Sequence, residues 1–203
     1  TAFVNAGDEV ILFDPSYDSY DPSVRLNGGI PVHINLQPPH FSIPWEEVKS
    51  RINFRTRMIM VNTPHNPTGT VLTPADLREL EKLAVKHDLI ILSDEVYERL
   101  IYEDKSHESV LKYPGLAGRS IAAFSFGKTF HATGWKVGYT VASPELTTEI
   151  RKTHQFITFA VNTPVQLALA TYLGNPEHYL ELRHFYQKKR DYFLVQLKGS
   201  CFP

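Results

Sequence analysis

The stretch Ile121-Ala122-Ala123-Phe124-Ser125-Phe126-Gly127-Lys128-Thr129 joins the pattern of a buried strand to a lysine. Its first four residues are apolar and β-prone, so Lys128 is predicted just beyond the carboxyl end of a strand, where open α/β sheets bind ligands. A second lysine, Lys136, follows eight residues later. Burial and a nearby second cation both disfavour an ammonium group, and an amine that is deprotonated near neutral pH can form an imine. A lysine at this position can therefore be desolvated and reactive.

Two other interpretations compete for Gly127-Lys128-Thr129. A lysine after a glycine is commonly a solvated loop cation. The same three residues also match the end of a phosphate-binding P-loop, but that motif needs a glycine five positions before Gly127, where the chain has Ala122. The P-loop is therefore excluded, and this stretch alone does not exclude the solvated cation.

Short apolar runs recur along the chain with helical patterns between them. This alternation is typical of βα units, so the predicted fold is α/β, a three-layer α-β-α domain around a mostly parallel sheet. A cap and proline signal, Thr73-Pro74-Ala75-Asp76, predicts the start of a helix that ends near His87. The apolar runs are Glu9 to Phe13, Pro31 to Leu36, Met58 to Val61, Leu89 to Leu92, Ile121 to Phe124 and Val137 to Ala142.

The strand patterns stop at Pro144. The last helical pattern is long and suits a helix that leaves the sheet domain toward a second domain. We predict two parts, a large domain over residues 1–175 and a long helix over residues 176–203. Because the chain begins with Thr1 and stops directly after a helical pattern, we expect it to be a fragment. The helical patterns cover Glu145 to Thr158, Pro164 to Leu173 and His178 to Lys198.

Composition narrows the partners of this 203-residue chain. Its 21 Lys and Arg nearly balance 22 Asp and Glu, without a basic stripe, which argues against nucleic acid as a ligand. No run approaches the roughly eighteen apolar residues of a membrane span. The single Cys201 cannot form an internal disulfide, so a cytoplasmic location is expected. Three scattered histidines, His65, His131 and His154, lack metal-ligand spacing, and no metal site is predicted.

An imine-forming lysine predicts pyridoxal phosphate (PLP) as a cofactor, and such a site needs an acid opposite the pyridine nitrogen. Asp94, in Ser93-Asp94-Glu95-Val96-Tyr97, follows the run Leu89 to Leu92 and should lie at the same sheet edge as Lys128. A carboxylate there keeps the pyridine nitrogen protonated. The alternative role for this aspartate is a helix cap.

Two further side chains are candidate donors to the phenolic oxygen of PLP. Tyr97 lies three residues after Asp94 and is on the same side if the chain turns helically there. Asn66, in Asn62-Thr63-Pro64-His65-Asn66-Pro67-Thr68-Gly69, follows the run Met58 to Val61 and carries an amide donor. Ordinary packing of the tyrosine and a simple Asn-Pro turn are the alternatives.

Stacking and phosphate groups complete the predicted site. Tyr17, in Asp14-Pro15-Ser16-Tyr17, offers a flat face to the pyridine ring. Ser125 can donate a hydroxyl to the phosphate, and Lys136 can add a full charge. Packing or surface placement is the alternative for each residue. Their joint occurrence, each just beyond a predicted strand, favours the cofactor site.

Together these motifs resemble the large domain of a fold-type I, class I/II PLP-dependent aminotransferase, over nearly the whole chain. Three stretches are most similar to kynurenine, glutamine-phenylpyruvate and methionine aminotransferases. They are Thr63 to Pro67, Lys128 to Gly138 and Val161 to Pro164.

The resemblance implies a role for each candidate. Lys128 would be the Schiff-base lysine and proton shuttle, and Asp94 the partner of the pyridine nitrogen. Phe159 would match an aromatic residue that enters the substrate pocket of the neighbouring subunit in a homodimer, while a buried helix face is its alternative role. The remaining roles fall to Asn66 and Tyr97 at the phenolic oxygen, Tyr17 against the ring, and Ser125 and Lys136 at the phosphate.

The implied reaction is transamination between an amino acid and a 2-oxo acid. A PLP-dependent β-elimination from cysteine conjugates is the nearest alternative, since fold and cofactor do not choose between them. An inactive fragment or interaction module is the alternative of another class. The family's glycine-containing phosphate loop is expected upstream of residue 1. Arg183 and Arg190 do not match its carboxylate-binding arginine motif, so no residue is assigned to the substrate carboxylate.

Overall fold

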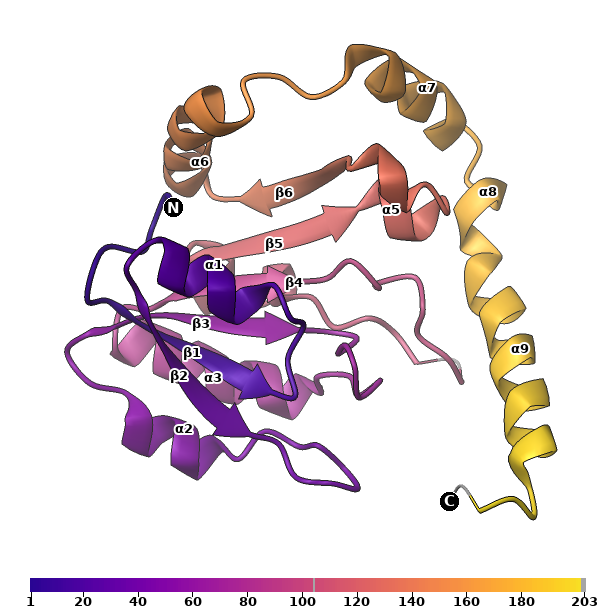
Figure 1. Ribbon diagram of the computed structural model, residues 1–203, viewed down its shortest axis with the longest axis horizontal. Coiled ribbons are helices and arrows are strands. Elements are labelled where there is room, and N and C mark those ends of the chain that lie inside the picture. Colours follow the sequence, from indigo (N-terminus) through magenta and orange to yellow (C-terminus); the bar gives the residue numbers. More distant parts are fainter. Residues whose placement is uncertain (104, 202–203) are drawn as a thin grey trace.

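The apolar runs form six strands that pair in the order β2-β1-β3-β4-β5-β6. The computed structural model describes residues 1–103 and 105–201. Five strands are parallel, and β6 runs antiparallel to β5, so the predicted mostly parallel α/β fold is confirmed (Figure 1). The strands are β1 (Glu9–Asp14), β2 (Ile30–Asn35), β3 (Thr56–Asn62), β4 (Ile90–Asp94), β5 (Ser120–Ser125) and β6 (Gly138–Ala142).

The helices also follow the sequence signals closely. Thr73 caps α3 through its side chain, and Asp76 returns the bond to the Thr73 backbone, which completes a capping box at the predicted start. The predicted helix from residue 178 to residue 198 is divided into α8 and α9 at Glu181. The helices are α1 (Tyr20–Leu26), α2 (Trp45–Arg51), α3 (Pro74–Lys86), α4 (Pro114–Ala117), α5 (Phe126–Thr129), α6 (Pro144–Ile157), α7 (Thr163–Leu173), α8 (Glu177–Leu180) and α9 (Leu182–Leu197). Two 3₁₀ turns are η1 (Val110–Lys112) and η2 (Thr133–Trp135).

Helices cover both faces of the sheet (Figure 1). On one face, α2, α3 and α4 pack against the strands, with Leu80 of α3 completely buried in the larger apolar cluster. On the other face, Val24 of α1 and Ile150 of α6 pack in a second cluster. The central strands β1 and β3 are therefore buried on both sides, as expected for parallel strands with continuous apolar runs, whereas the edge strand β6 is largely exposed.

Strand register brings the carboxyl ends of the central strands together. Asn62 of β3 pairs with Asp94 of β4, and Asp94 pairs in turn with Ala123 of β5. Chain segments that leave these strand ends therefore start within a few ångströms of one another. This is the edge at which open α/β sheets bind ligands.

Helix α9 runs beyond this edge of the sheet (Figure 1). It contacts the segment that follows β4, where the Gln187 side chain accepts a bond from the Glu103 amide at 3.0 Å and Arg190 pairs with Glu103 at 3.1 Å. The division at residue 175 stays a prediction. Of the two predicted parts, residue 104 and residues 202–203 lie outside the described residues. Across the described ranges, no helix has the length and apolarity needed to cross a membrane.

The burial of Leu80 in the core leads to a prediction about stability. Leu80→Ala removes a completely buried side chain on α3 and should lower the free energy of unfolding by about 2 to 5 kcal/mol. Urea denaturation followed by circular dichroism measures this loss. A loss below about 0.5 kcal/mol, which is typical of surface substitutions, would contradict the described core.

Candidate active site

A cavity of about 160 Å³ opens at the carboxyl edge of β3, β4 and β5. It contains six of the predicted cofactor residues, although they come from four separate segments of the chain, which follow or end β1, β3, β4 and β5. The strand register described above explains why these segments converge. The cavity is lined by Tyr17, Tyr20, Asn62, Asn66, Asp94, Val96, Tyr97, Ser125 and Lys128.

Lys128 stands on α5, the single helical turn that begins directly after β5. Gly127 permits this tight turn, because a Cβ atom there would lie 2.8 Å from the Cα of Thr133. The Lys128 Nζ lies 5.3 Å from the centre of the Tyr97 ring, within the range of a cation–π contact. Lys128 is exposed in this structure, so the desolvation that its position after a strand would allow is not present here.

Asp94 points into the cavity from the end of β4. Its Oδ2 accepts a bond of 2.6 Å from the Tyr20 hydroxyl, and its Oδ1 accepts a bond of 3.2 Å from the Val96 amide. The second bond resembles the helix cap that was the alternative role for Asp94, but the segment that it closes is a turn and not a helix. The aspartate thus has one fixed orientation at the base of the site.

Tyr20 is a site residue that the sequence analysis missed. Burial first, and then the negative charge of Asp94, raise the pKa of the Tyr20 phenol far above its usual value of 10. Its ring also meets the Tyr17 ring edge-on, with centroids 5.5 Å apart. The only sequence signal was its position three residues after Tyr17, which becomes informative once α1 is known to begin at Tyr20.

Asn62 is a second residue that the sequence analysis missed. The backbone amide of Asn66 donates to the Asn62 Oδ1 at 2.7 Å, and the Asn62 Nδ2 donates to the Asp94 carbonyl at 2.9 Å. The side chain of Asn62 is buried, so this single amide ties the Asn66 loop to the end of β4. An asparagine that directly ends an apolar run was the signal available in the sequence.

The other predicted residues take two kinds of position. Tyr17, with 46% of its surface exposed, presents its ring at the cavity, and Ser125 ends β5 beside Lys128. Lys136 and Phe159 do not line the cavity. Lys136 is exposed in a left-handed conformation after η2, and Phe159 is 75% exposed beyond α6. The alternative that Phe159 lies on a buried helix face is therefore wrong.

The donor set fits PLP. The Asp94 carboxylate suits a protonated pyridine nitrogen, the Lys128 amine suits the aldehyde carbon, and the flat Tyr17 ring suits the pyridine ring. The side-chain amide of Asn66 and the hydroxyl of Tyr97 supply two donors in the same cavity. Among the described residues, no group of three His, Cys, Asp or Glu side chains is arranged to hold a metal ion.

The pKa of Tyr20 makes a testable prediction. A phenol whose pKa is raised in the folded protein contributes stability that is complete below pH 10 and is lost as the pH rises toward the folded value. The free energy of unfolding should therefore fall more steeply above pH 10 in the unchanged protein than in Tyr20→Phe. Urea denaturation at a series of pH values between 8 and 11 measures both slopes. Equal slopes would mean that Tyr20 does not have the described environment.

Comparisons with known proteins agree with the geometry. The family model for class I and II aminotransferases matches residues 1–202. Methionine aminotransferase of Escherichia coli is 52% identical over 201 residues, which cover 98% of this chain and 52% of the relative. Kynurenine–oxoglutarate transaminase of Dictyostelium discoideum is 36% identical over 217 residues, which cover 97% of this chain and 50% of the relative.

Solved structures show the same fold. A methionine aminotransferase structure from Escherichia coli superposes with a TM-score of 0.96 at 51% identity, over 98% of this chain and 53% of that chain. The structure of N-succinyldiaminopimelate aminotransferase from Mycobacterium tuberculosis superposes with a TM-score of 0.92 at 33% identity. The match covers 97% of this chain and 52% of that chain. The chain thus spans about half the length of the relatives it matches. On both sequence and structure, the chain belongs to the class I and II aminotransferase family.

Proposed function

We propose that this chain forms the PLP-binding part of an aminotransferase that moves an amino group between an amino acid and a 2-oxo acid. The observation that carries the proposal is that Lys128 and Asp94 reach one cavity from the ends of neighbouring strands. PLP chemistry requires of its protein an amine for the imine and an acid for the pyridine nitrogen, and both line this cavity. Family membership supports the same reaction class.

Each side chain has a defined task in this proposal. Bound PLP would supply an electron sink for the bond that breaks at the substrate α-carbon. Asp94 would hold the proton on the pyridine nitrogen, and the Tyr20 hydroxyl fixes the orientation of that carboxylate. Lys128 would anchor the cofactor through Nζ and, once released, move the α-proton of the substrate.

The remaining contacts to PLP are proposed from the resemblance and the placement of each residue. Tyr17 would stack on the ring, and Asn66 and Tyr97 would donate to the phenolic oxygen. Ser125 would bind the phosphate from the cavity wall, while the role of Lys136 at the phosphate rests on the resemblance alone, because Lys136 does not line the cavity.

We also propose the substrate class, the assembly and the compartment. The relatives are named for methionine and kynurenine, so we expect a methionine-type or aromatic amino donor. A homodimer, with Phe159 reaching the neighbouring substrate pocket, follows from the family resemblance, and the exposure of Phe159 suits it. The cytoplasm suits a chain whose single cysteine forms no internal disulfide.

Lys128→Ala tests the cofactor assignment. This change should remove the visible absorbance of bound PLP and the borohydride-trapped adduct, because no other lysine lines the cavity. Lys152→Ala is the matched control, since Lys152 is exposed on α6 and paired with Glu149. Mass spectrometry of the reduced protein reads both variants. A trapped adduct that persists in Lys128→Ala would refute the assignment.

Product analysis tests the reaction class. With PLP, methionine or kynurenine, and a 2-oxo acid acceptor, the protein should form the matching 2-oxo acid and a new amino acid in equal amounts. Omitting the acceptor should stop catalytic turnover after one equivalent of product. Release of pyruvate and ammonia from a cysteine conjugate without an acceptor would instead identify β-elimination.

A further inference from the structure

Glu95 is a buried acid for which the proposed reaction has no task. It follows Asp94 directly, yet its side chain has 0% exposure and does not line the cavity. Side chains of an extended chain alternate between its two sides. Asp94 therefore faces the cavity, while Glu95 joins Ser93 on the opposite side, where Val110 belongs to the larger apolar cluster.

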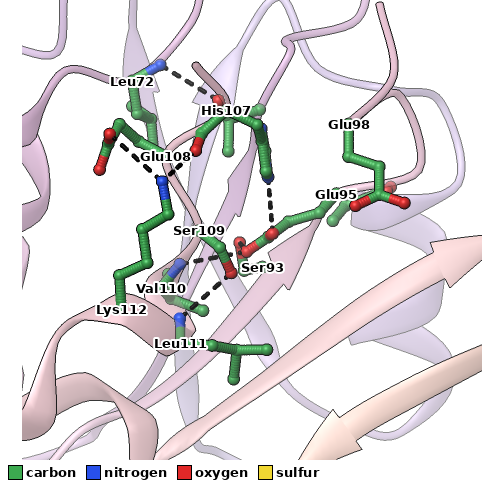
Figure 2. A network of polar contacts seen from close by, with 12 residues as sticks. Leu72, Ser93, Glu95, Glu98, His107, Glu108, Ser109, Val110, Leu111 and Lys112 are labelled. Atoms are coloured by element: carbon green, nitrogen blue, oxygen red, sulfur yellow. Dashed lines mark hydrogen bonds and ion pairs between the residues drawn. The ribbon is translucent and has the colours of Figure 1, made fainter. Parts of the chain in front are cut away.

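Three donors surround the Glu95 carboxylate (Figure 2). The Ser93 hydroxyl and the Val110 amide donate to Oε1 at 2.8 and 3.2 Å, and His107 Nε2 approaches Oε2 at 2.7 Å. His107 Nδ1 is buried with no hydrogen-bond partner among the described residues, so the tautomer with hydrogen on Nε2 fits. A buried carboxylate is costly unless it is paired in this way.

The pairing closes the segment that follows β4. Ser93 belongs to the strand itself, whereas His107 and Val110 lie 12 and 15 residues beyond Glu95. Their bonds bring the far end of this segment back to its start, and the Ser109 hydroxyl, which accepts from the Leu111 amide, orders that far end (Figure 2). Tyr97 lies in the closed segment, two residues from the carboxylate.

The peptide between Asp94 and Glu95 is also held by hydrogen bonds. The Asp94 carbonyl accepts from the Asn62 side chain and from the Thr63 amide, at 2.9 and 3.0 Å. The Glu95 amide donates to the Ala123 carbonyl at 2.9 Å. These bonds hold the peptide within the sheet, and the Glu95 side chain holds it from the face away from the cavity. The directions of the Asp94 and Tyr97 side chains depend on all of these contacts.

We propose that Glu95, held by His107, is a positioning residue of the cofactor site. It orients Asp94 and Tyr97 from the side of their segment that faces away from the cavity. The inference rests on the proposed PLP binding. A purely structural role predicts only a loss of stability when Glu95 is replaced. A positioning role predicts in addition a loss of cofactor affinity that another equally destabilising core change does not produce.

The experiment compares Glu95→Ala with Leu80→Ala, a substitution of another completely buried side chain that does not line the cavity. PLP is titrated into each purified protein at a temperature where all are folded, and the dissociation constant is read from absorbance. Glu95→Ala should bind PLP at least about tenfold more weakly than the unchanged protein, and Leu80→Ala within about twofold. Equal affinities of the two variants would overturn the positioning role. If Glu95→Ala does not fold, His107→Ala, which leaves two of the three donors, is held to the same expectation.

A double-mutant cycle tests whether Glu95 acts through Tyr97. Tyr97→Phe is combined with Glu95→Ala, and the PLP dissociation constants of the four proteins are compared. The loss caused by Tyr97→Phe should shrink at least about threefold once Glu95 is absent, because the hydroxyl is no longer held in place. Strict additivity would contradict this route. Glu95→Gln, which keeps an acceptor for the Val110 amide, should recover part of the affinity lost in Glu95→Ala, and no recovery would also count against the proposal.

Hydrogen exchange separates this inference from the cofactor assignment. Without PLP, amides of residues 96–100 should exchange faster in Glu95→Ala than in Leu80→Ala, once both are corrected for global stability. Unchanged protection would overturn the inference even where PLP still binds. If the unchanged protein does not bind PLP at all, the proposed function fails, while the exchange result still tests the role of Glu95.

Discussion

The peptide between Asp94 and Glu95 is the constraint on which the rest of the site depends. Its carbonyl accepts from Asn62 and Thr63 at the end of β3, and its amide donates to Ala123 in β5. Buried backbone groups must find partners, so these bonds are obligatory for three parallel strands that end together. Because the peptide cannot shift without breaking them, the side chains on either side of it leave the sheet in defined directions. The cavity is the space that those directions enclose.

Two acids flank this peptide, and the protein treats them differently. The Asp94 carboxylate accepts hydrogen bonds from the Tyr20 hydroxyl and the Val96 amide, and it also lines the cavity. Glu95 is completely buried and surrounded by three donors. A carboxylate that must meet a ligand needs an unoccupied approach, whereas one that holds structure needs full pairing, because a buried unpaired charge is strongly unfavourable. The same residue chemistry thus leaves one carboxylate open toward the cavity and fully pairs the other on the opposite face.

Much of this arrangement could be predicted from local patterns. Apolar runs separated by helical patterns indicated the parallel sheet, and the capping box at Thr73 marked the start of α3. Polar residues just beyond strands indicated the site, since parallel strands share one carboxyl edge. Tyr20 and Asn62 were missed because each acts through a partner more than thirty positions away, Asp94. The exposure of Lys128 could not be predicted, since a strand pattern does not show how far the following turn projects a side chain.

The sequence by itself determined the strands, the boundaries of α3, α6 and α7, the family and the residue types that PLP chemistry needs. These properties depend on neighbours within a few positions, or on motifs that survive as short strings. Only the tertiary structure decided which groups meet. It placed Tyr20 on Asp94, turned Glu95 away from the cavity, left Phe159 exposed and kept Lys136 off the cavity wall. The physical reason is that strand register and side-chain direction follow from packing between segments distant in sequence, and a one-residue shift of register would reverse every face.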